Sequence, residues 1–274
     1  MYLGSHISIA QGFTKAGEIA LSISANTFQF FTRNPRGGNA KELDIDDIDG
    51  LKRILEENKF GPLLAHAPYT LNMASHKEDT WNFAKMAFQD DLKRLEIIPC
   101  SLYNFHPGSH TGKGVEYGID RIAGVLNEII TGKESTTILL EGMSGKGTEI
   151  GSTFEELRDI IQKVKHSELM GICLDTCHLH SAGYDIVNNL DGVLEEFDKI
   201  VGIDRLKAIH LNDNMNEYNS KKDRHAGIGE GSIGLEALIN IIRHPQLKDI
   251  PFFLETPYEP EGHKKEIEII RSMV

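Results

Sequence analysis

The sequence of 274 residues is poor in cysteine and contains no long apolar run. Its only cysteines are Cys100, Cys173 and Cys177. Because this number is small and odd, we expect reduced thiols in a cytoplasmic protein and no disulfide framework. No stretch approaches the ~18 consecutive apolar residues of a membrane span. The start, from Met1 to His6, also lacks the basic stretch and apolar run of a signal peptide.

Positive charge is scarce as well, since 29 lysines and arginines face 41 acidic residues and leave a net charge of −12. This balance argues against a nucleic-acid partner, because phosphate contacts usually come from a basic surface. However, carboxylates that bind metal ions would be neutralised. The basic residues also gather locally, at Arg33 and Arg36 and again at Lys221, Lys222 and Arg224. Charge therefore lowers the expectation of DNA binding without excluding it.

No Pro-, Gly- or Ser-rich linker, sequence repeat or low-complexity segment divides the chain. The Gly-rich stretch that ends at Gly151 lacks the Gly-Lys-Ser/Thr ending of a phosphate-binding P-loop. The length is close to the ~250 residues of one eight-stranded α/β barrel. We expect a single domain over residues 1–274, and a monomer, since no feature indicates a protein partner.

Short apolar or β-branched runs alternate with amphipathic stretches along the chain. This alternation predicts an α/β fold with parallel strands joined by helices, either a (β/α)8 TIM barrel or an open doubly wound sheet. The predicted strands are Tyr2–Ile7, Thr27–Phe31, Pro62–Ala67, Ser101–His106, Thr137–Glu141, Met170–Thr176, Lys207–Asn212 and Pro251–Thr256.

Two of the intervening stretches show clear helical periodicity. Apolar residues recur at three- and four-residue steps from Trp81 to Leu95 and from Phe154 to Val164. Ser152 and Glu155 have the spacing of a capping box at the start of the second helix.

Six predicted strands end in a potential metal ligand, at intervals of 34 to 45 residues, which is about the length of one βαβ unit. In a barrel these side chains would converge at the carboxyl-terminal rim, where barrel active sites form, whereas an open sheet would spread them along a line. This convergence favours the barrel. The six residues are His66, His106, Glu141, Asp175, His210 and Glu255.

Two segments that we expect to be loops add His178, Asp223 and His225. Any one of these residues alone would be read as a structural histidine, a helix cap or a loop carboxylate. Nine together indicate a shared site. Because one ion takes about four ligands, they imply two or three ions with a bridging carboxylate, and the share of histidine favours zinc over magnesium. Cys173 and Cys177 are more simply explained as small buried residues.

Several segments, in this order, resemble the signature motifs of the endonuclease IV family, the AP endonucleases of the xylose-isomerase-like barrel superfamily. The resemblance extends from Phe31 to Glu255. The segments are Phe31-Thr32-Arg33-Asn34, His66-Ala67-Pro68-Tyr69, Asn104-Phe105-His106-Pro107-Gly108-Ser109-His110, Cys173-Leu174-Asp175-Thr176-Cys177-His178, His210-Leu211-Asn212-Asp213, Asp223-Arg224-His225 with Gly229-Glu230-Gly231, and Leu254-Glu255-Thr256.

The resemblance implies a zinc-dependent DNA-repair endonuclease of base excision repair, with about three Zn²⁺ per chain. It would hydrolyse the phosphodiester bond 5′ to an abasic site in double-stranded DNA, leaving a 3′-hydroxyl and a 5′-deoxyribose phosphate. The resemblance also implies catalytic roles for Glu141 and Glu255 and DNA contacts for Arg36 and Tyr69. It places His66, His106 and Glu141 on a first ion; Glu141, Asp175, His210 and Glu255 on a second; and His178, Asp223 and His225 on a third.

Other readings of single residues remain open. Tyr69 could be an ordinary rim aromatic and Arg36 a solvated loop charge. We expect His6 and His110 to support the site or the fold and not to bind metal. After Glu141 the family usually continues with Asn and Thr, whereas this chain has Gly142 and Met143, a change that could alter how the ligands are oriented.

Two alternative functions remain. A sugar isomerase or epimerase shares the barrel and uses divalent metals, but it would need fewer histidine ligands and a lysine or carboxylate pair for proton transfer. A nucleic-acid-binding relative without catalysis would be expected to have lost some ligands.

Overall fold

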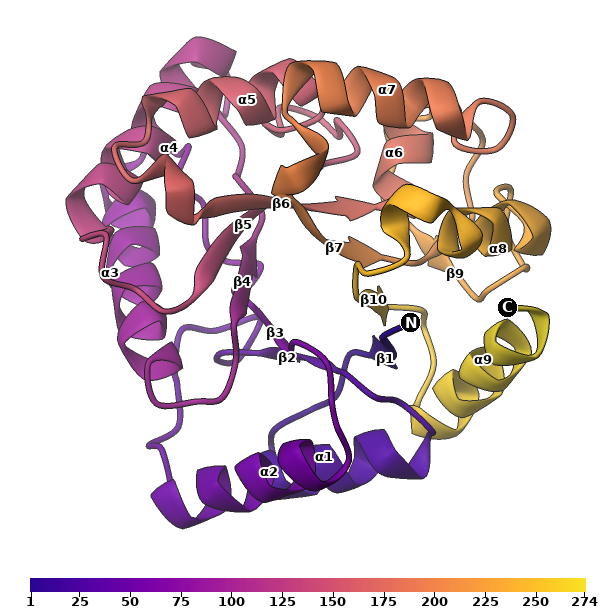
Figure 1. Cartoon of the computed structure of the whole chain (residues 1–274). Coiled ribbons are helices and arrows are strands. Elements are labelled where there is room, and N and C mark those ends of the chain that lie inside the picture. The colour runs from indigo at the N-terminus through magenta and orange to yellow at the C-terminus, as the bar shows by residue number, and fades with distance from the viewer.

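Eight parallel strands form one continuous sheet in the computed structural model, which describes residues 1–274 (Figure 1). The strand order is β1-β10-β7-β6-β5-β4-β3-β2, so barrel strands that follow one another along the chain are neighbours in the sheet. A parallel bridge between His6 and Gln29 joins the two ends of the sheet and closes it. The strands are β1 (Leu3–Ser5), β2 (Gln29–Phe31), β3 (Leu64–His66), β4 (Leu102–Phe105), β5 (Thr137–Glu141), β6 (Met170–Asp175), β7 (Leu206–His210) and β10 (Phe252–Leu254).

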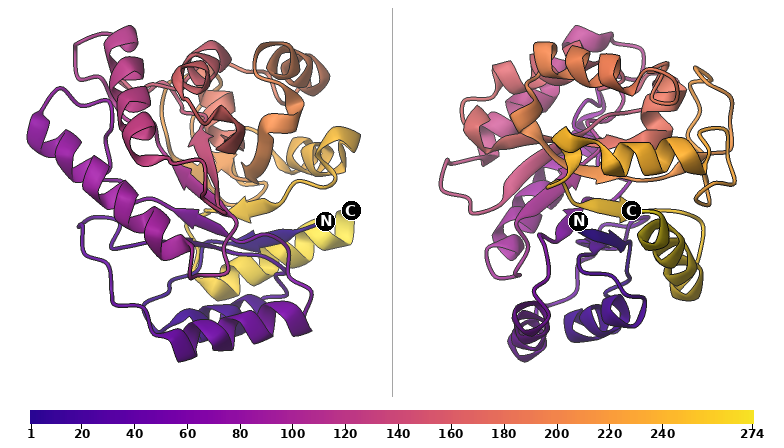
Figure 2. Two further views of the ribbon diagram at one scale, coloured as in Figure 1. Left: turned by 60° about the vertical axis from the view of Figure 1, so that its left-hand side comes forward. Right: turned by 45° about the vertical axis from the view of Figure 1, so that its right-hand side comes forward.

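The predicted (β/α)8 TIM barrel is therefore confirmed, and the open doubly wound sheet is excluded. All eight predicted strands are present, although most are shorter at their ends than the sequence indicated. The helices surround the strands in all three views (Figures 1 and 2). They are α1 (Phe13–Ser22), α2 (Ile45–Glu57), α3 (Glu78–Leu95), α4 (Val115–Ile129), α5 (Phe154–Lys163), α6 (Thr176–Ala182), α7 (Leu190–Ile200), α8 (Leu235–Arg243) and α9 (Pro260–Met273).

Three short 3-10 turns and one hairpin complete the secondary structure. The turns are η1 (Ser167–Leu169), η2 (Ile203–Arg205) and η3 (Pro245–Leu247). The hairpin pairs β8 (Asp213–Asn214) antiparallel with β9 (His225–Ala226), between β7 and α8. No helix has the length and apolar character needed to cross a membrane. The three cysteines are free and buried.

Two local predictions need correction. The residue that caps α5 is Thr153, whose side chain accepts the amide of Glu156, so the predicted Ser152–Glu155 box is one residue out of place. The Glu156 carboxylate reaches back to the amide of Ser152. The segment that contains His178 is the helix α6 and not a loop, because Asp175 caps it by accepting the amide of His178 at 2.9 Å.

The interior of the barrel contains a small apolar layer that is separate from the main core of 62 residues. Two positions further along each strand, a polar residue follows. Because side chains on a strand alternate between two faces, both residues of each pair face the barrel interior. The pairs are Leu64 and His66, Leu102 and Asn104, Leu139 and Glu141, Cys173 and Asp175, Ala208 and His210, and Phe253 and Glu255. A polar layer thus lies above an apolar one at the carboxyl ends of the strands.

Candidate metal centre

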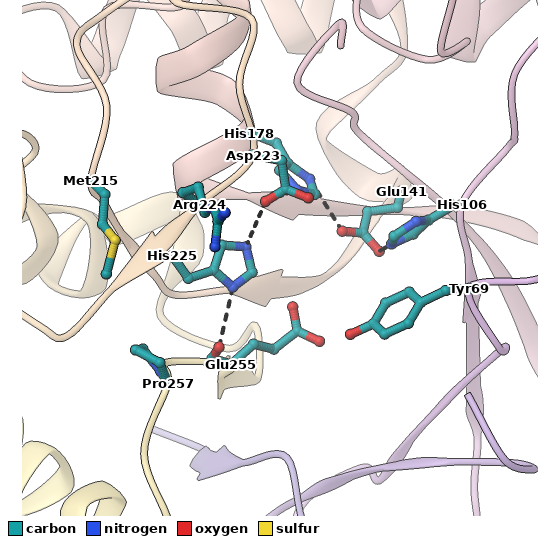
Figure 3. Close-up of a pocket in the computed structure, with 10 residues that line it drawn as sticks. All are labelled: Tyr69, His106, Glu141, His178, Met215, Asp223, Arg224, His225, Glu255 and Pro257. Atoms are coloured by element: carbon teal, nitrogen blue, oxygen red, sulfur yellow. Dashed lines mark hydrogen bonds and ion pairs between the residues drawn. The ribbon is translucent and has the colours of Figure 1, made fainter. Parts of the chain in front are cut away.

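A cavity of about 460 Å³ opens above this polar layer (Figure 3). Its floor and walls include most of the predicted ligands and the ring of Tyr69. The lining residues are Tyr69, His106, Glu141, His178, Met215, Asp223, Arg224, His225, Glu255 and Pro257.

The structure brings all nine predicted ligands together. They form three groups whose potential ligand atoms lie within 4.8 Å of one another, with Glu141 shared by two of the groups. A fourth group combines Asp175 and His225 with Cys177. The three groups are His66, His106 and Glu141; Glu141, Asp175, His210 and Glu255; and His178, Asp223 and His225.

Glu141 lies at the centre of the cluster and is completely buried. Its Oε2 atom is 3.3 Å from Nε2 of His66 and 3.3 Å from Nε2 of His106. Its Oε1 atom is 3.2 Å from Nδ1 of His178 and 3.4 Å from Nδ1 of His210. One carboxylate therefore faces four imidazole rings, which come from β3, α6, β7 and the residue that follows β4, as a bridging ligand would.

Hydrogen bonds to the outer nitrogens set which nitrogen of each ring faces the centre. A carbonyl oxygen can only accept, so the ring nitrogen that faces it carries the proton and the other nitrogen keeps its lone pair. In His66, His178 and His225, Nδ1 donates to a backbone carbonyl. In His210, Nε2 instead donates to a side-chain oxygen on the outer side of the ring. The bonds run from His66 to Ala67 (2.6 Å), from His178 to Gly142 (3.0 Å), from His225 to Glu255 (3.1 Å) and from His210 to Oε1 of Gln29 (2.6 Å).

The inward atoms fit metal ions. Four of the eight buried side-chain polar atoms without a hydrogen-bond partner belong to this cluster: Glu141 Oε1, His178 Nε2, His210 Nδ1 and His225 Nε2. Leaving one such atom unpaired costs about 1–3 kcal/mol. Four of them in one place are explained by cations between them, and the mixture of imidazole and carboxylate donors suits zinc.

The electrostatics of the cluster indicate the same need for positive charge. Burial raises the pKa of the Glu141 carboxyl, but the rings of His106 and His210 hold it well below its usual value. Burial lowers the pKa of His178, yet Asp175 and Asp223 raise it well above its usual value. The acidic side chains thus favour positive charge beside them, which bound metal ions would supply.

Three buried amide side chains orient the ligands, and none of them was predicted. Gln29 donates to Oε1 of Glu255 at 2.5 Å, Asn104 donates to Oε2 of Glu141 at 2.5 Å, and Asn212 donates to Oδ2 of Asp175 at 2.7 Å. The two-residue periodicity of the strands could have identified Asn104, which occupies the inward position of β4. His106 lies two residues further, beyond the end of that strand.

Two features of the sequence that raised questions are resolved by the geometry. The carbonyl of Gly142 accepts the bond from His178, so a main-chain atom orients this ring and does not depend on the side chain at that position. His6 accepts a hydrogen bond from Gln29 at 3.1 Å, and burial lowers its pKa to about 4, so it is a neutral supporting residue. His110 accepts the amides of Gly112 and Gly114 and orders its own turn.

The rim residues differ in how far they are available to a substrate. Tyr69 is 58% exposed and lines the cavity, and its ring also packs against Phe31 and His106. Arg36 is exposed on the loop between β2 and α2 but does not line the cavity. Arg33, which we counted among the local basic residues, is buried in an ion pair with Asp91 and is not available to a phosphate.

The sequence and the fold both match known proteins over nearly the whole chain. A family model described as xylose isomerase-like TIM barrel matches residues 18–273. The chain is 58% identical to the probable endonuclease 4 of Clostridium beijerinckii over 271 residues, which are 99% of this chain and 98% of the relative. The chain belongs to the endonuclease IV family. This endonuclease IV family member is therefore an enzyme of the hydrolase class, an endonuclease.

Solved structures agree with this assignment. Endonuclease IV from Thermus thermophilus superposes with a TM-score of 0.89 at 30% identity, covering 100% of this chain and 98% of that one. A D-tagatose 3-epimerase-like protein also superposes, with a TM-score of 0.74 at 22% identity and coverage of 100% and 97%. At that identity the likeness shows the shared barrel alone, so it gives the epimerase alternative no support beyond the fold.

Proposed function

We propose that this endonuclease IV family member repairs DNA by hydrolysing the phosphodiester bond on the 5′ side of abasic sites in double-stranded DNA. The products would be a 3′-hydroxyl and a 5′-deoxyribose phosphate. The observation that carries the proposal is the set of four unpartnered ligand atoms in the cluster, one on the shared carboxylate of Glu141 and three on histidine rings. The endonuclease relatives at high identity support the choice of substrate class.

The nine ligands support about three Zn²⁺ per chain. His66, His106 and Glu141 would hold the first ion. Glu141 would be shared with the second, completed by Asp175, His210 and Glu255, while His178, Asp223 and His225 would hold the third. Bound zinc supplies Lewis-acid chemistry, which lowers the pKa of water and neutralises charge on a phosphate and its leaving oxygen.

The protein's own residues would prepare this chemistry. Burial of Glu141 and the bonds from Asn104 and Gln29 hold the ligand carboxylates in one orientation before substrate arrives. Glu255 lines the cavity with Oε1 bound by Gln29, and its Oε2 lies 3.3 Å from Nδ1 of His210, where it would face the second ion. Such preorganisation means that the charged groups need not reorganise during the reaction. Much of the rate enhancement of enzymes arises from this preorganisation.

Recognition of the lesion would depend on Tyr69 and Arg36. The planar ring of Tyr69 stands at the cavity wall and could fill the space of a missing base. The loops that carry the two residues are tied together, because Oγ1 of Thr70 donates to the carbonyl of Gly37 at 3.1 Å.

We further propose that the protein acts as a single-domain monomer in the cytoplasm. One core cluster of 62 residues supports the single domain.

A cleavage assay tests this function directly. A zinc-loaded sample is incubated with a duplex that carries one stable abasic analogue, and an intact duplex serves as the control. We expect one nick 5′ to the lesion, with a 3′ end that a DNA polymerase can extend. Binding of the abasic duplex without a nick would instead support a non-catalytic relative. Conversion of a free ketose without any nicking would support the epimerase.

A further inference from the structure

Asp213 is a completely buried carboxylate that does not belong to any of the metal-binding groups. Five backbone amides converge on its two oxygens. Oδ1 accepts from the amides of Asn214 (2.8 Å) and Ile233 (2.9 Å), Oδ2 accepts from those of Gly229 (3.1 Å) and Gly231 (3.0 Å), and the amide of Gly234 lies within 3.3 Å of both oxygens. Four of these amides belong to one turn, residues 227–234, between β9 and α8.

The turn fits closely around this carboxylate. A Cβ atom on Gly231 would lie 2.5 Å from Oδ1 of Asp213 and 2.4 Å from the carbonyl oxygen of Asn214. These distances are shorter than real Cβ contacts, so a side chain at this position would displace the turn. Gly231 is therefore explained by the approach of the backbone to Asp213, and Gly229 by its φ of 81°, which favours glycine.

The same residue is part of the hairpin that carries two candidate ligands. Asp213 pairs with Ala226 and Asn214 pairs with His225 in the antiparallel β8–β9 ladder. The amide of Met215 extends the ladder by donating to the carbonyl of Arg224 at 3.0 Å. Figure 3 shows the Asp223 carboxylate beside His178 and in contact with His225, and Oδ1 of Asp223 lies 3.4 Å from Nε2 of each ring. Unlike the other seven ligands, Asp223 and His225 come from neither a barrel strand end nor α6.

We propose that Asp213 is a positioning residue for the third metal group, His178, Asp223 and His225. This inference rests on the proposed function, because it requires the third group to bind zinc. Both oxygens of the carboxylate accept hydrogen bonds from backbone amides. The carboxylate thereby holds the turn and the hairpin in place before any metal binds. Without this carboxylate, the backbone amides of the turn lose their acceptor, and the hairpin that carries His225 loses its attachment to the turn.

Two variants disturb this arrangement independently. In Asp213→Asn one acceptor oxygen becomes an NH₂ group that faces backbone amides, at almost unchanged volume. In Gly231→Ala the carboxylate stays and the added methyl displaces the turn. Asp47→Asn is the matched control, because Asp47 also accepts two backbone amides, those of Phe13 (2.6 Å) and Thr14 (2.9 Å), and is not a ligand. Gly124→Ala is the glycine control, with nothing within 4 Å of its added Cβ.

The measurement is zinc per chain by elemental analysis of the full-length protein after gel filtration, with thermal unfolding recorded in parallel. We expect about three zincs in the wild type and in both controls, and about two in Asp213→Asn and Gly231→Ala. Titration back with zinc should show that the third ion binds about 10–100-fold more weakly, the usual effect of losing support around a ligand. Asp47→Asn should lower the unfolding temperature without any loss of zinc, which separates positioning from general stability.

Three zincs in the wild type and in both variants would overturn the role of Asp213 and leave the proposed function intact. If Asp213→Asn does not fold, Gly231→Ala decides the question by the same zinc count. Fewer than three zincs in the wild-type chain would overturn the three-ion proposal itself, and this inference with it.

Discussion

Oε1 of Gln29 lies 2.6 Å from Nε2 of His210, and this contact determines which nitrogen of the ring faces the metal centre. The amide group of the same side chain donates to Oε1 of Glu255 at 2.5 Å. A single buried glutamine therefore orients two proposed ligands of the second group, one through its amide oxygen and one through its amide nitrogen.

Replacement of Gln29 by leucine should weaken metal binding. The ring of His210 would lose the acceptor that sets its tautomer, and Glu255 would lose a donor, so we expect about a 10–100-fold loss in metal affinity. Competition with a chromophoric chelator measures this directly. Gln89→Leu, on the exposed surface of α3, is the control. Unchanged zinc affinity in Gln29→Leu would show that the ligands hold their orientation without the glutamine.

Removal of the Glu141 carboxylate should cost more than removal of a ligand from one group. Glu141 belongs to two of the three proposed ion groups, whereas His225 belongs to one of these three. We expect Glu141→Ala to retain fewer zincs than His225→Ala and to nick abasic duplex more slowly, because two neighbouring cations would lose the negative charge between them. Zinc content and nicking rate are compared in the two variants. Equal and mild losses would contradict a bridging role.

Tyr69→Ala should impair cleavage of abasic duplex far more than it impairs zinc binding. If the ring stacks in place of a missing base, its loss removes about 1–3 kcal/mol, which corresponds to roughly 5- to 150-fold in rate. Tyr218→Ala is the control, since Tyr218 is also exposed but does not line the cavity.

The contacts of Tyr69 with Phe31 and His106 provide the competing explanation, in which the ring only packs against its neighbours. Assays on abasic duplex and on a small activated phosphodiester distinguish the two roles. A packing role predicts equal losses on both substrates, and that result would remove Tyr69 from the recognition site.

Asp91→Leu should destabilise the whole fold. Arg33 donates to Oδ1 of Asp91 from Nη2 at 2.6 Å and from Nε at 3.0 Å, and both side chains are buried. Removing one partner of such a pair leaves a buried charge and costs about 3–5 kcal/mol. Urea unfolding measures the cost. Asp90→Asn removes only the half-exposed partner of Arg33 and should cost at most about 1 kcal/mol; similar losses in both variants would argue against this account.

Asp47 should contribute stability that depends on pH. Burial raises its pKa, but the amides of Phe13 and Thr14 hold the pKa below its ordinary value. Because the folded pKa is the lower one, the contribution is complete above the ordinary value and is lost as the pH falls through the folded value. At pH 7 we expect Asp47→Asn to cost about 0.5–1.5 kcal/mol, the usual contribution of one hydrogen bond. Urea unfolding from pH 7 to 3 should show the difference shrinking at the acid end; a constant difference would exclude this linkage.

The residues that could be read from the sequence are those whose role depends on position along one strand. Glu141, Asp175 and His210 each end a strand, and their spacing by about one βαβ unit was enough to predict a shared rim. The alternation of side chains along each strand then determines that they face the barrel interior. Strand ends and side-chain alternation are local properties. They can therefore be predicted from the sequence of one strand without knowing which other strands lie beside it.

The tertiary structure decided the contacts between residues that are distant in sequence. Gln29 and Glu255 meet across 226 positions only because the sheet closes on itself. Arg33 looks like a surface charge in the sequence, and the packing of α3 against its loop turns it into a buried ion pair with Asp91. Asp213 could not be recognised either, because the amides it binds become neighbours only when the turn folds back over β8. Hydrogen bonds of this kind depend on the relative placement of separate elements, which no local periodicity records.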